Sequence, residues 1–160
     1  MSDGGFSAPI FIADQMLGSL ARWLRMLGYD TLYERDLTDD EIVEMAEKEG
    51  RTILTRDRSL ASKGVALLIS STSLDDQLLA VKNAFHLTFQ PEKLRCSVCN
   101  GALMKIDFES ATGEVPQRSL NNCTELWRCQ RCQKIYWDGS HWNGILKRFE
   151  RLKLMKEKKE

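Results

Sequence analysis

Apolar and polar residues follow two alternating periods along the first 90 residues. Short apolar runs of strand length predict buried strands at residues 9–13, 31–33, 52–55 and 65–69. Between these runs, apolar side chains recur at helical spacing, for example at Leu20, Trp23, Leu24 and Leu27. Strands that alternate with helices through short connections predict an α/β fold with a parallel sheet flanked by helices.

Capping residues indicate where the predicted helices begin and end. Gly28 follows the first apolar stripe and can end the helix in a left-handed conformation. Thr38, with Glu41 three residues later, forms a capping box for a helix that runs to Gly50. Ser73 is a good N-cap for the last helix of this region.

The pattern changes near Pro91. Residues 104–108 alternate between apolar and charged side chains, which predicts a half-buried ribbon strand with residues 135–137 as its partner. The polar segment 113–122 between them predicts a mobile loop. Helical spacing returns from Trp142, with an apolar stripe at Ile145, Phe149, Leu152 and Met155 among many basic residues.

These patterns predict three segments, and the charge differs between the first of them and the remainder of the chain. They are an α/β domain at residues 1–90, a metal-stapled ribbon at 91–142 and a basic amphipathic helix at 143–160. The net charge of zero conceals 9 basic against 14 acidic residues in 1–90, and 14 basic against 9 acidic residues in 91–160. An acidic front and a basic back suit a protein that binds a metal at one end and a polyanion at the other, although unrelated surface charge is an alternative.

Several classes of protein are not expected. No apolar run approaches the length of a membrane span, and the first residues do not resemble a targeting segment, so we expect no membrane partner and a cytoplasmic location. The oligomeric state is not predicted. The chain has five cysteines, an odd number, which favours reduced thiols and a metal over a secreted disulfide framework.

Four of the cysteines form two matched pairs, Cys96 with Cys99 and Cys129 with Cys132. Two such CxxC pairs predict a structural zinc site with four thiolate ligands, and a rubredoxin-like iron site is the alternative. A metal with four protein ligands has no open position, so chemistry is expected elsewhere. Cys123 does not fit the spacing and is expected to be a small buried residue.

Three aspartates follow the predicted strands and are the candidate catalytic residues. Asp14 comes directly after the first strand, Asp57 shortly after the third, and Asp39 opens the helix reached from the second. The carboxyl ends of parallel strands meet at one edge, where like charges about 5 Å apart would repel by roughly 3 kcal/mol. Such a cluster needs a hard cation, Mg²⁺ or Mn²⁺, and favours phosphodiester hydrolysis. For each aspartate alone, helix capping is an alternative.

Other charged residues could assist this site. Arg22 and Arg25 are expected on the face of the first helix opposite its apolar stripe, where they could bind a substrate phosphate, or they could simply be solvated. Asp75 and Asp76 follow the fourth strand and could add a ligand, although Asp76 is also explained as a helix-capping residue.

Beyond these patterns, the chain resembles a known family. The resemblance is carried by the stretch Asp14–Asp30, the segment Gly50–Arg58, the two cysteine pairs, and residues 135–142. These match the Mut-seven carboxy-terminal RNase domain family, which is described as a PIN-like nuclease fold followed by a zinc ribbon. The resemblance implies a metal-dependent ribonuclease whose acidic cluster falls on Asp14, Asp39 and Asp57. Ser59 stands where similar proteins often have a second aspartate.

The sequence leaves three hypotheses of different classes. The first is an RNA-cleaving enzyme that uses Mg²⁺ or Mn²⁺ at the aspartates and holds RNA with its zinc ribbon. The second is a nonenzymatic zinc-ribbon adaptor that binds RNA, with an acidic cluster that is structural. The third is electron transfer at a thiolate iron site.

Overall fold

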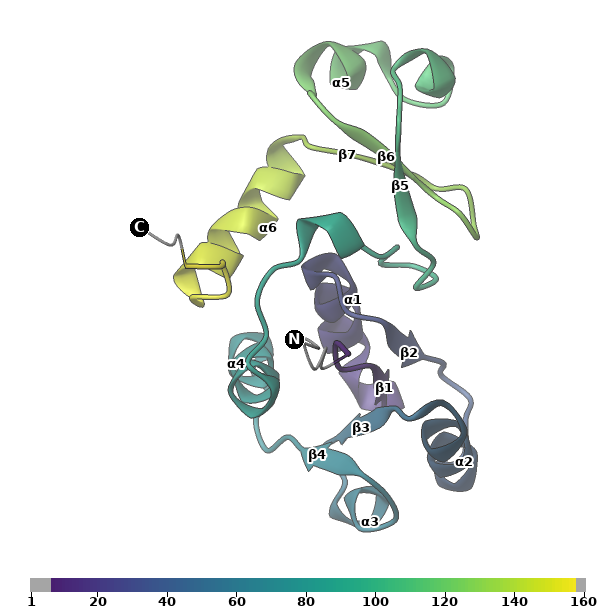
Figure 1. Ribbon diagram of the computed structural model, residues 1–160, viewed down its shortest axis with the longest axis vertical. Helices are drawn as coiled ribbons and strands as arrows, with labels where there is room; N and C mark the ends of the chain where they lie inside the picture. Colours follow the sequence, from purple (N-terminus) through teal and green to yellow (C-terminus); the bar gives the residue numbers. More distant parts are fainter. Residues whose placement is uncertain (1–6, 158–160) are drawn as a thin grey trace, which may run out of the picture.

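The computed structural model describes residues 7–157, which form an α/β domain and a small ribbon joined by a helix that contacts both (Figure 1). The domain contains a parallel sheet of β1 (Phe11–Ala13), β2 (Thr31–Tyr33), β3 (Thr52–Thr55) and β4 (Ala66–Leu68) in the order β2-β1-β3-β4. The predicted α/β fold is therefore confirmed; β2 and β3 have the predicted bounds, and β1 and β4 are slightly shorter than expected.

Helices cover both faces of this sheet. They are α1 (Gly18–Leu27), α2 (Asp39–Glu49), α3 (Arg58–Ala61) and α4 (Leu74–Phe85). Phe11 and Ala13 of β1 pack in the cluster that contains α1 and α4, whereas Ile12 packs against α2 and α3 on the other face. Successive strand residues point to opposite faces, which explains why β1 is buried along its whole length.

The predicted helix ends are confirmed. Thr38 and Glu41 form both hydrogen bonds of the capping box, and Ser73 accepts a hydrogen bond from the Asp76 N–H. Gly28 and Gly50 end α1 and α2 with φ angles of 104° and 71°. These left-handed conformations favour glycine because it has no Cβ atom.

The second module is a three-stranded antiparallel ribbon. Its strands are β5 (Leu103–Ile106), β6 (Leu126–Cys129) and β7 (Ile135–Trp137), in the order β5-β6-β7. The prediction that β5 pairs with β7 is wrong, because both strands pair with β6. Sequence reasoning missed β6 because it is only four residues long and ends in the second cysteine pair.

The polar segment between β5 and β6 is not the predicted loop. It contains a 3₁₀ turn at Glu109–Ala111 and the short helix α5 (Gln117–Asn122). A few apolar side chains of this segment bury themselves against the ribbon together with Cys123, which is buried as expected. The segment is mostly polar in sequence, so these buried apolar residues were not predicted.

The helix α6 (Ser140–Arg151) is shorter than the predicted C-terminal helix. The chain turns away after Arg151, where Lys153 has a φ of 56° and the Phe89 N–H donates to the Leu154 carbonyl oxygen at 2.7 Å. Phe149 of α6 is fully buried, with its ring centroid 5.8 Å from that of Trp23 and 5.4 Å from that of Phe89. The three predicted segments thus share one apolar cluster.

None of the helices within residues 7–157 has the length and apolar character needed to cross a membrane.

Candidate metal centre and acidic strand edge

The four cysteines of the two CxxC pairs lie together at one end of the ribbon, and their Sγ atoms are all within 4.8 Å of one another. The Sγ atoms of Cys96 and Cys132 are 3.7 Å apart, and those of Cys99 and Cys129 are 3.4 Å apart. In a tetrahedral zinc site with Zn–S bonds of about 2.3 Å, sulfur atoms are about 3.8 Å apart. The four cysteines could therefore hold zinc.

Both cysteine pairs have the same backbone turn. Asn100 and Gln133, each directly after the second cysteine of its pair, have a φ of 68°. The Asn100 N–H donates to the Cys96 carbonyl oxygen at 2.9 Å, and the Gln133 N–H donates to the Cys129 carbonyl oxygen at 3.1 Å. This repetition places the two thiol pairs symmetrically around a common centre.

Backbone N–H groups also prepare the cluster for a metal. Burial would raise the pKa of Cys129, but N–H groups of Cys132 and Arg131 donate to its Sγ atom and lower the pKa to about 7. At Gly101, an added Cβ atom would lie 2.6 Å from the Cys129 Sγ atom. Only glycine fits this position, because the backbone passes directly against the sulfur cluster.

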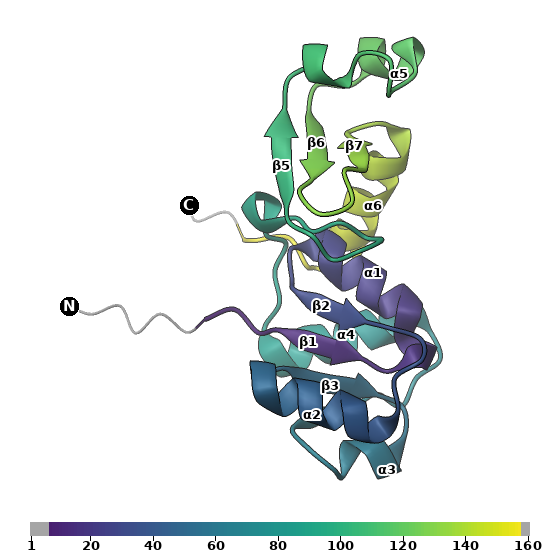
Figure 2. The same ribbon diagram turned by 90° about the vertical axis from the view of Figure 1, so that its right-hand side faces the viewer.

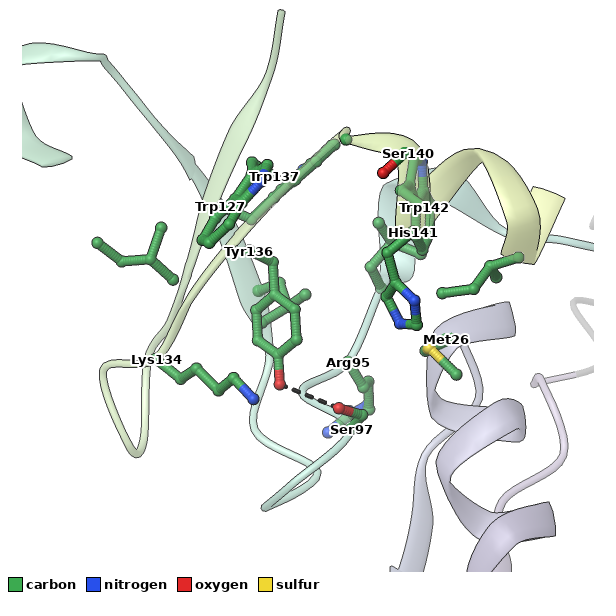
Figure 3. A pocket seen from close by; sticks show the side chains of 15 residues that line it. Met26, Arg95, Ser97, Trp127, Lys134, Tyr136, Trp137, Ser140, His141 and Trp142 are labelled. Atoms are coloured by element: carbon green, nitrogen blue, oxygen red, sulfur yellow. Dashed lines mark hydrogen bonds between the residues drawn. The ribbon is translucent and has the colours of Figure 1, made fainter. Parts of the chain in front are cut away.

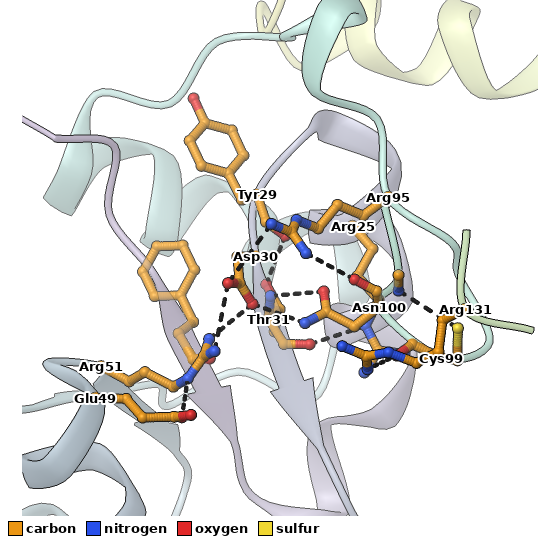
Figure 4. Close-up of polar contacts among 12 residues, drawn as sticks. Arg25, Tyr29, Asp30, Thr31, Glu49, Arg51, Arg95, Cys99, Asn100 and Arg131 are labelled. Carbon is orange, nitrogen blue, oxygen red and sulfur yellow. Dashed lines mark hydrogen bonds and ion pairs between the residues drawn. The ribbon is translucent and has the colours of Figure 1, made fainter. Parts of the chain in front are cut away.

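The first cysteine pair is docked onto the α/β domain through polar contacts (Figure 4). The side chain of Asn100 accepts a hydrogen bond from the Thr31 N–H at 3.0 Å and donates to Asp30 at 2.7 Å. Arg51 also binds Asp30, with its Nη1 atom 2.8 Å from the Asp30 Oδ1 atom. Asp30 therefore joins the ribbon to the start of β2.

Arg25 belongs to this junction and not to a solvated helix face. It is only 4% exposed, and its guanidinium donates to the carbonyl oxygens of Thr31 and Ser97, both at 2.9 Å. Desolvation by burial lowers its pKa. The expectation that Arg25 shares an open face with Arg22 is thus wrong, since the ribbon covers Arg25. Arg22 is exposed.

Asp14 is the most enclosed of the candidate catalytic residues, with 8% of its surface exposed. It follows β1 directly and forms the N-cap of the 3₁₀ turn that precedes α1. Its Oδ1 atom accepts a hydrogen bond from the Gln15 N–H at 2.7 Å, and its Oδ2 atom accepts one from the Thr55 hydroxyl at 2.9 Å. A carboxylate held on both oxygens has a fixed orientation.

Asp57 is tied to Asp14 through a shared neighbour. Its backbone N–H donates to the Thr55 hydroxyl oxygen at 2.9 Å, and its side chain caps α3 by accepting from the Ser59 N–H at 2.8 Å. Thr55, at the end of β3, thus makes hydrogen bonds to both residues. Thr55 was not predicted from the sequence. Its position at the end of a buried strand, two residues before Asp57, is the pattern that could have indicated a hydrogen-bonding role.

Asp39 and Asp75 have surroundings that differ from those of Asp14 and Asp57. Asp39 is the first residue of α2, after the Thr38 cap. Asp75 forms ion pairs with two arginines of α6, at 3.3 Å to Arg148 and 2.8 Å to Arg151. Within residues 7–157, the four cysteines are the one group of three or more potential metal ligands that lie close together.

The sheet topology nevertheless makes the carboxyl ends of β1 and β3, called here the acidic strand edge, a favourable binding site. The strand order reverses between β1 and β3, and ligands of open α/β sheets bind beyond the carboxyl ends of the strands at such a switch point. Asp14 and Asp57 follow these two strands. The helices α1 to α4 also begin on this side, since each follows a parallel strand (Figure 2), and their positive N-terminal ends favour anions.

One of the comparisons with known proteins identifies a family. Comparison with curated proteins gives no significant match. Residues 9–149 match a family described as the Mut7-C RNAse domain, which confirms the resemblance stated above and extends from β1 through most of α6. Because this match covers nearly the whole chain, the protein belongs to the Mut7-C RNAse domain family.

Proposed function

We propose that the protein is a metal-dependent ribonuclease that hydrolyses RNA phosphodiester bonds at the PIN-like strand edge formed by β1 and β3. The single observation that carries this proposal is the buried Asp14 carboxylate at the topological switch point, fixed by Thr55 and linked through it to Asp57. Membership of an RNAse domain family makes RNA the expected substrate.

The donor set at this edge suits Mg²⁺ or Mn²⁺. Carboxylate oxygens are hard ligands. Each Asp14 oxygen and the Asp57 Oδ1 atom accept one hydrogen bond and keep further lone pairs for a metal. Asp14 and Asp57, with Asp39 at the start of α2, are the residues that would hold the ion. When bound, the ion supplies activation of water and stabilisation of charge on the phosphate.

The remaining residues of the edge have positioning roles in this proposal. The Thr55 hydroxyl fixes the Asp14 carboxylate and the backbone of Asp57 relative to each other through two hydrogen bonds. Arg22 is exposed on α1, the helix that starts after Asp14, and would bind an RNA phosphate. Asp75 is assigned to the ion pairs with α6 rather than to the metal.

A second candidate function is RNA binding without cleavage. It is favoured by a specific observation, since Asp14 and Asp57 each accept a backbone hydrogen bond as the N-cap of the short helix that follows. In this case the acids stabilise turns, and the zinc ribbon with α6 supplies RNA affinity.

The test is incubation of labelled single-stranded and structured RNAs with the protein and Mn²⁺. We expect cleavage that falls at least 100-fold in Asp14→Asn and Asp57→Asn. Asparagine is also a good N-cap, so these variants keep the capping hydrogen bonds and should fold. Asp40→Asn is the matched control, because the Asp40 side chain is 91% exposed on the same helix turn as Asp39.

Two outcomes separate the candidate functions. Cleavage that survives in both Asp14→Asn and Asp57→Asn contradicts the proposed active centre. Salt-sensitive RNA binding with no cleavage under Mg²⁺, Mn²⁺ or Co²⁺ would favour the adaptor.

A further inference from the structure

A cavity of about 430 Å³ lies where the ribbon, α6 and the end of α1 meet, remote from the acidic strand edge (Figure 3). Its volume is within the range of ligand pockets, which is about 300–1,000 Å³. Aromatic rings form much of its wall, namely those of Trp127, Tyr136, Trp137 and Trp142. None of the proposed catalytic residues lines it.

The aromatic wall contains groups that suit a planar, polar ring. In Figure 3, Tyr136 of β7 and His141 of α6 face the space between these elements. The Lys134 Nζ atom lies 5.2 Å from the centroid of the Tyr136 ring. The Tyr136 hydroxyl is held against the Ser97 hydroxyl at 3.1 Å, so this ring has a fixed orientation.

The charge of the lining favours an anionic ligand. Lys134 and Arg95 are the cationic side chains of the lining, with Arg95 3.7 Å from Asp30, and no acidic side chain lines the cavity among the described residues. Lys134 and His141 are exposed at its rim. Aromatic rings that can stack on a base, together with the Lys134 ammonium group and the His141 imidazole at the rim that can meet a phosphate, are the features of a site for single-stranded nucleic acid.

A basic groove continues from the cavity along α6. His141 and Ile145 line both the cavity and this groove, which extends between α6 and Trp23 as far as Arg151. The helix from His141 to Arg151 rises by ten residue steps, which span about 15 Å. Lys147 and Arg148 line the groove, and Arg148 lies 4.6 Å from the centroid of the Trp23 ring.

The groove leads towards the proposed active centre. Trp23 belongs to α1, which begins at Gly18 shortly after Asp14, so the ring lies about 8 Å along the helix axis from the start of α1. At its far end, Arg151 contacts Asp75 in the first turn of α4, a helix that also begins at the acidic edge. The groove therefore extends from the cavity towards the helices that begin at that edge.

We propose that the cavity binds one unstacked nucleobase of single-stranded RNA, whose sugar–phosphate backbone continues along the groove between α1 and α6. This inference rests on the proposed function, because it takes RNA as the substrate. It adds a binding subsite that lies away from the point of cleavage and that would determine where along the strand the enzyme cuts.

The experiment uses the zinc-loaded protein without added Mg²⁺ or Mn²⁺. The probes are 12-nucleotide single-stranded RNAs that carry 2-aminopurine at one position each, because stacking on aromatic rings quenches its emission. We expect strong quenching at a single position, and its loss in Trp137→Leu with an increase in Kd of about 5-fold or more. We also expect Lys134→Ala and His141→Ala to raise Kd by about 2- to 5-fold.

Matched controls separate the subsite from general charge effects and from misfolding. Lys48→Ala removes one exposed lysine on α2, which packs on the other face of the sheet, and should leave Kd unchanged. The zinc content of Trp137→Leu checks that its ribbon is folded. If Trp137→Leu loses zinc, the test rests on the Kd values of Lys134→Ala and His141→Ala, because these two positions are exposed.

Cleavage with Mn²⁺ is measured in parallel, so that the two proposals can fail separately. Position-specific quenching that needs the cavity residues, without any cleavage, supports the subsite and contradicts the ribonuclease. Cleavage and binding that are unchanged in all three cavity variants overturn the subsite and leave the ribonuclease intact. Absence of RNA binding, or uniform emission at every position, also overturns the subsite.

Discussion

Thr55 at the end of β3 is completely buried, and its hydroxyl makes two hydrogen bonds. It donates to the Asp14 carboxylate and accepts from the Asp57 N–H. A buried group that loses its partner costs about 1–3 kcal/mol, because it also lost its water on folding. Thr55 is thus the residue on which the geometry of the acidic edge depends most directly.

Thr55→Val tests this role, since valine has nearly the same shape without the hydroxyl. We expect the free energy of unfolding in urea to fall by about 1–3 kcal/mol. Thr52→Val on the same strand is the control, and its hydroxyl makes no hydrogen bond within residues 7–157, so a change below about 0.5 kcal/mol is expected. Equal effects at the two positions would contradict a special role for Thr55.

Asp30 makes the stability of the ribbon junction dependent on pH. Burial would raise its pKa, but hydrogen bonds from Arg51 and Asn100 outweigh burial and hold the pKa below the ordinary value of 3.8. A carboxylate with a lowered folded-state pKa stabilises the fold above the unfolded-state pKa, and this contribution is lost as the pH falls through the folded-state pKa. The loss is therefore expected below about pH 4.

Asp30→Asn should lower the free energy of unfolding at pH 7 by about 2 kcal/mol, because Arg51 loses one of its two ion pairs and keeps only that with Glu49. The difference from the unsubstituted protein should shrink below about pH 4, where Asp30 itself becomes protonated. Urea unfolding at pH 7 and at pH 3 measures both effects. Asp40→Asn is the control, since that exposed ion pair contributes little. A difference that persists unchanged at pH 3 would exclude the charge of Asp30 as the cause.

The candidate site shows how far single residues can be interpreted from sequence. The cysteine pairs were predictable because their ligand spacing is local. Arg25 was not, because the carbonyl oxygen of Ser97 that it binds lies 72 residues away in sequence. Helical periodicity places Arg25 near Arg22, but only the tertiary structure shows that the ribbon buries one and leaves the other exposed.

At the scale of elements, Gly28 connects the end of α1 to the segment that leads into the ribbon. Its φ is 104°, and an added Cβ atom would lie 2.7 Å from the Gln90 carbonyl oxygen. The Gln90 N–H in turn donates to the Leu27 carbonyl oxygen at 2.8 Å. Gly28 therefore combines a left-handed conformation with close backbone packing, whereas Gly50 has the conformation alone and nothing within 4 Å.

Gly28→Ala and Gly50→Ala form a matched pair that separates these two costs. We expect Gly50→Ala to lower the free energy of unfolding by about 1 kcal/mol through backbone strain. Gly28→Ala should cost at least about 1 kcal/mol more, because the backbone of Gln90 must also move. Thermal and urea unfolding of both variants measures the difference, and equal losses would show that the close contact is relieved at little cost.

Phe149 anchors helix α6 on the α/β domain, because its ring packs between those of Trp23 and Phe89. Phe149→Ala should lower the free energy of unfolding by about 3–5 kcal/mol, because the fully buried ring leaves a cavity between Trp23 and Phe89. Arg151→Ala on the same helix should cost less than about 1 kcal/mol, since its side chain is 61% exposed. Urea unfolding compares the two variants, and a small loss for Phe149→Ala would indicate that α6 docks by its charges instead.

Elements were predictable where one period continued over a whole strand or helix. The four strands and the capped helices of the α/β domain meet this condition. The strand β6, the helix α5 and the end of α6 do not, because each depends on contacts made after the ribbon has formed. Leu126, for example, is buried by residues of the segment that sequence reasoning expected to be a loop.

For the whole molecule, α1 connects the two candidate sites. Its start follows Asp14 at the acidic edge, and its last turn contains Arg25 against the cysteine ribbon. The two positions are separated by about 10 Å of helix from Gly18 to Arg25. The cysteine ribbon therefore packs near the domain that carries the proposed active centre, and its cysteines are separate from the aspartates of that centre.

Metal removal tests whether this docking depends on the cysteine centre. Without a metal, the four thiolates lose the ligand bonds that hold the two turns together, and Asn100 should no longer be kept against β2. We expect the Thr31 N–H, which donates to the Asn100 side chain, to exchange with deuterium at least 10-fold faster after treatment with a zinc chelator. The Ile53 N–H is the internal reference, because it bonds to Val65 within the sheet and does not involve the ribbon. If Thr31 keeps its protection while zinc is lost, the polar contacts of Asp30 and Arg25 are sufficient to hold the ribbon, and the metal stabilises only the turns that bind it.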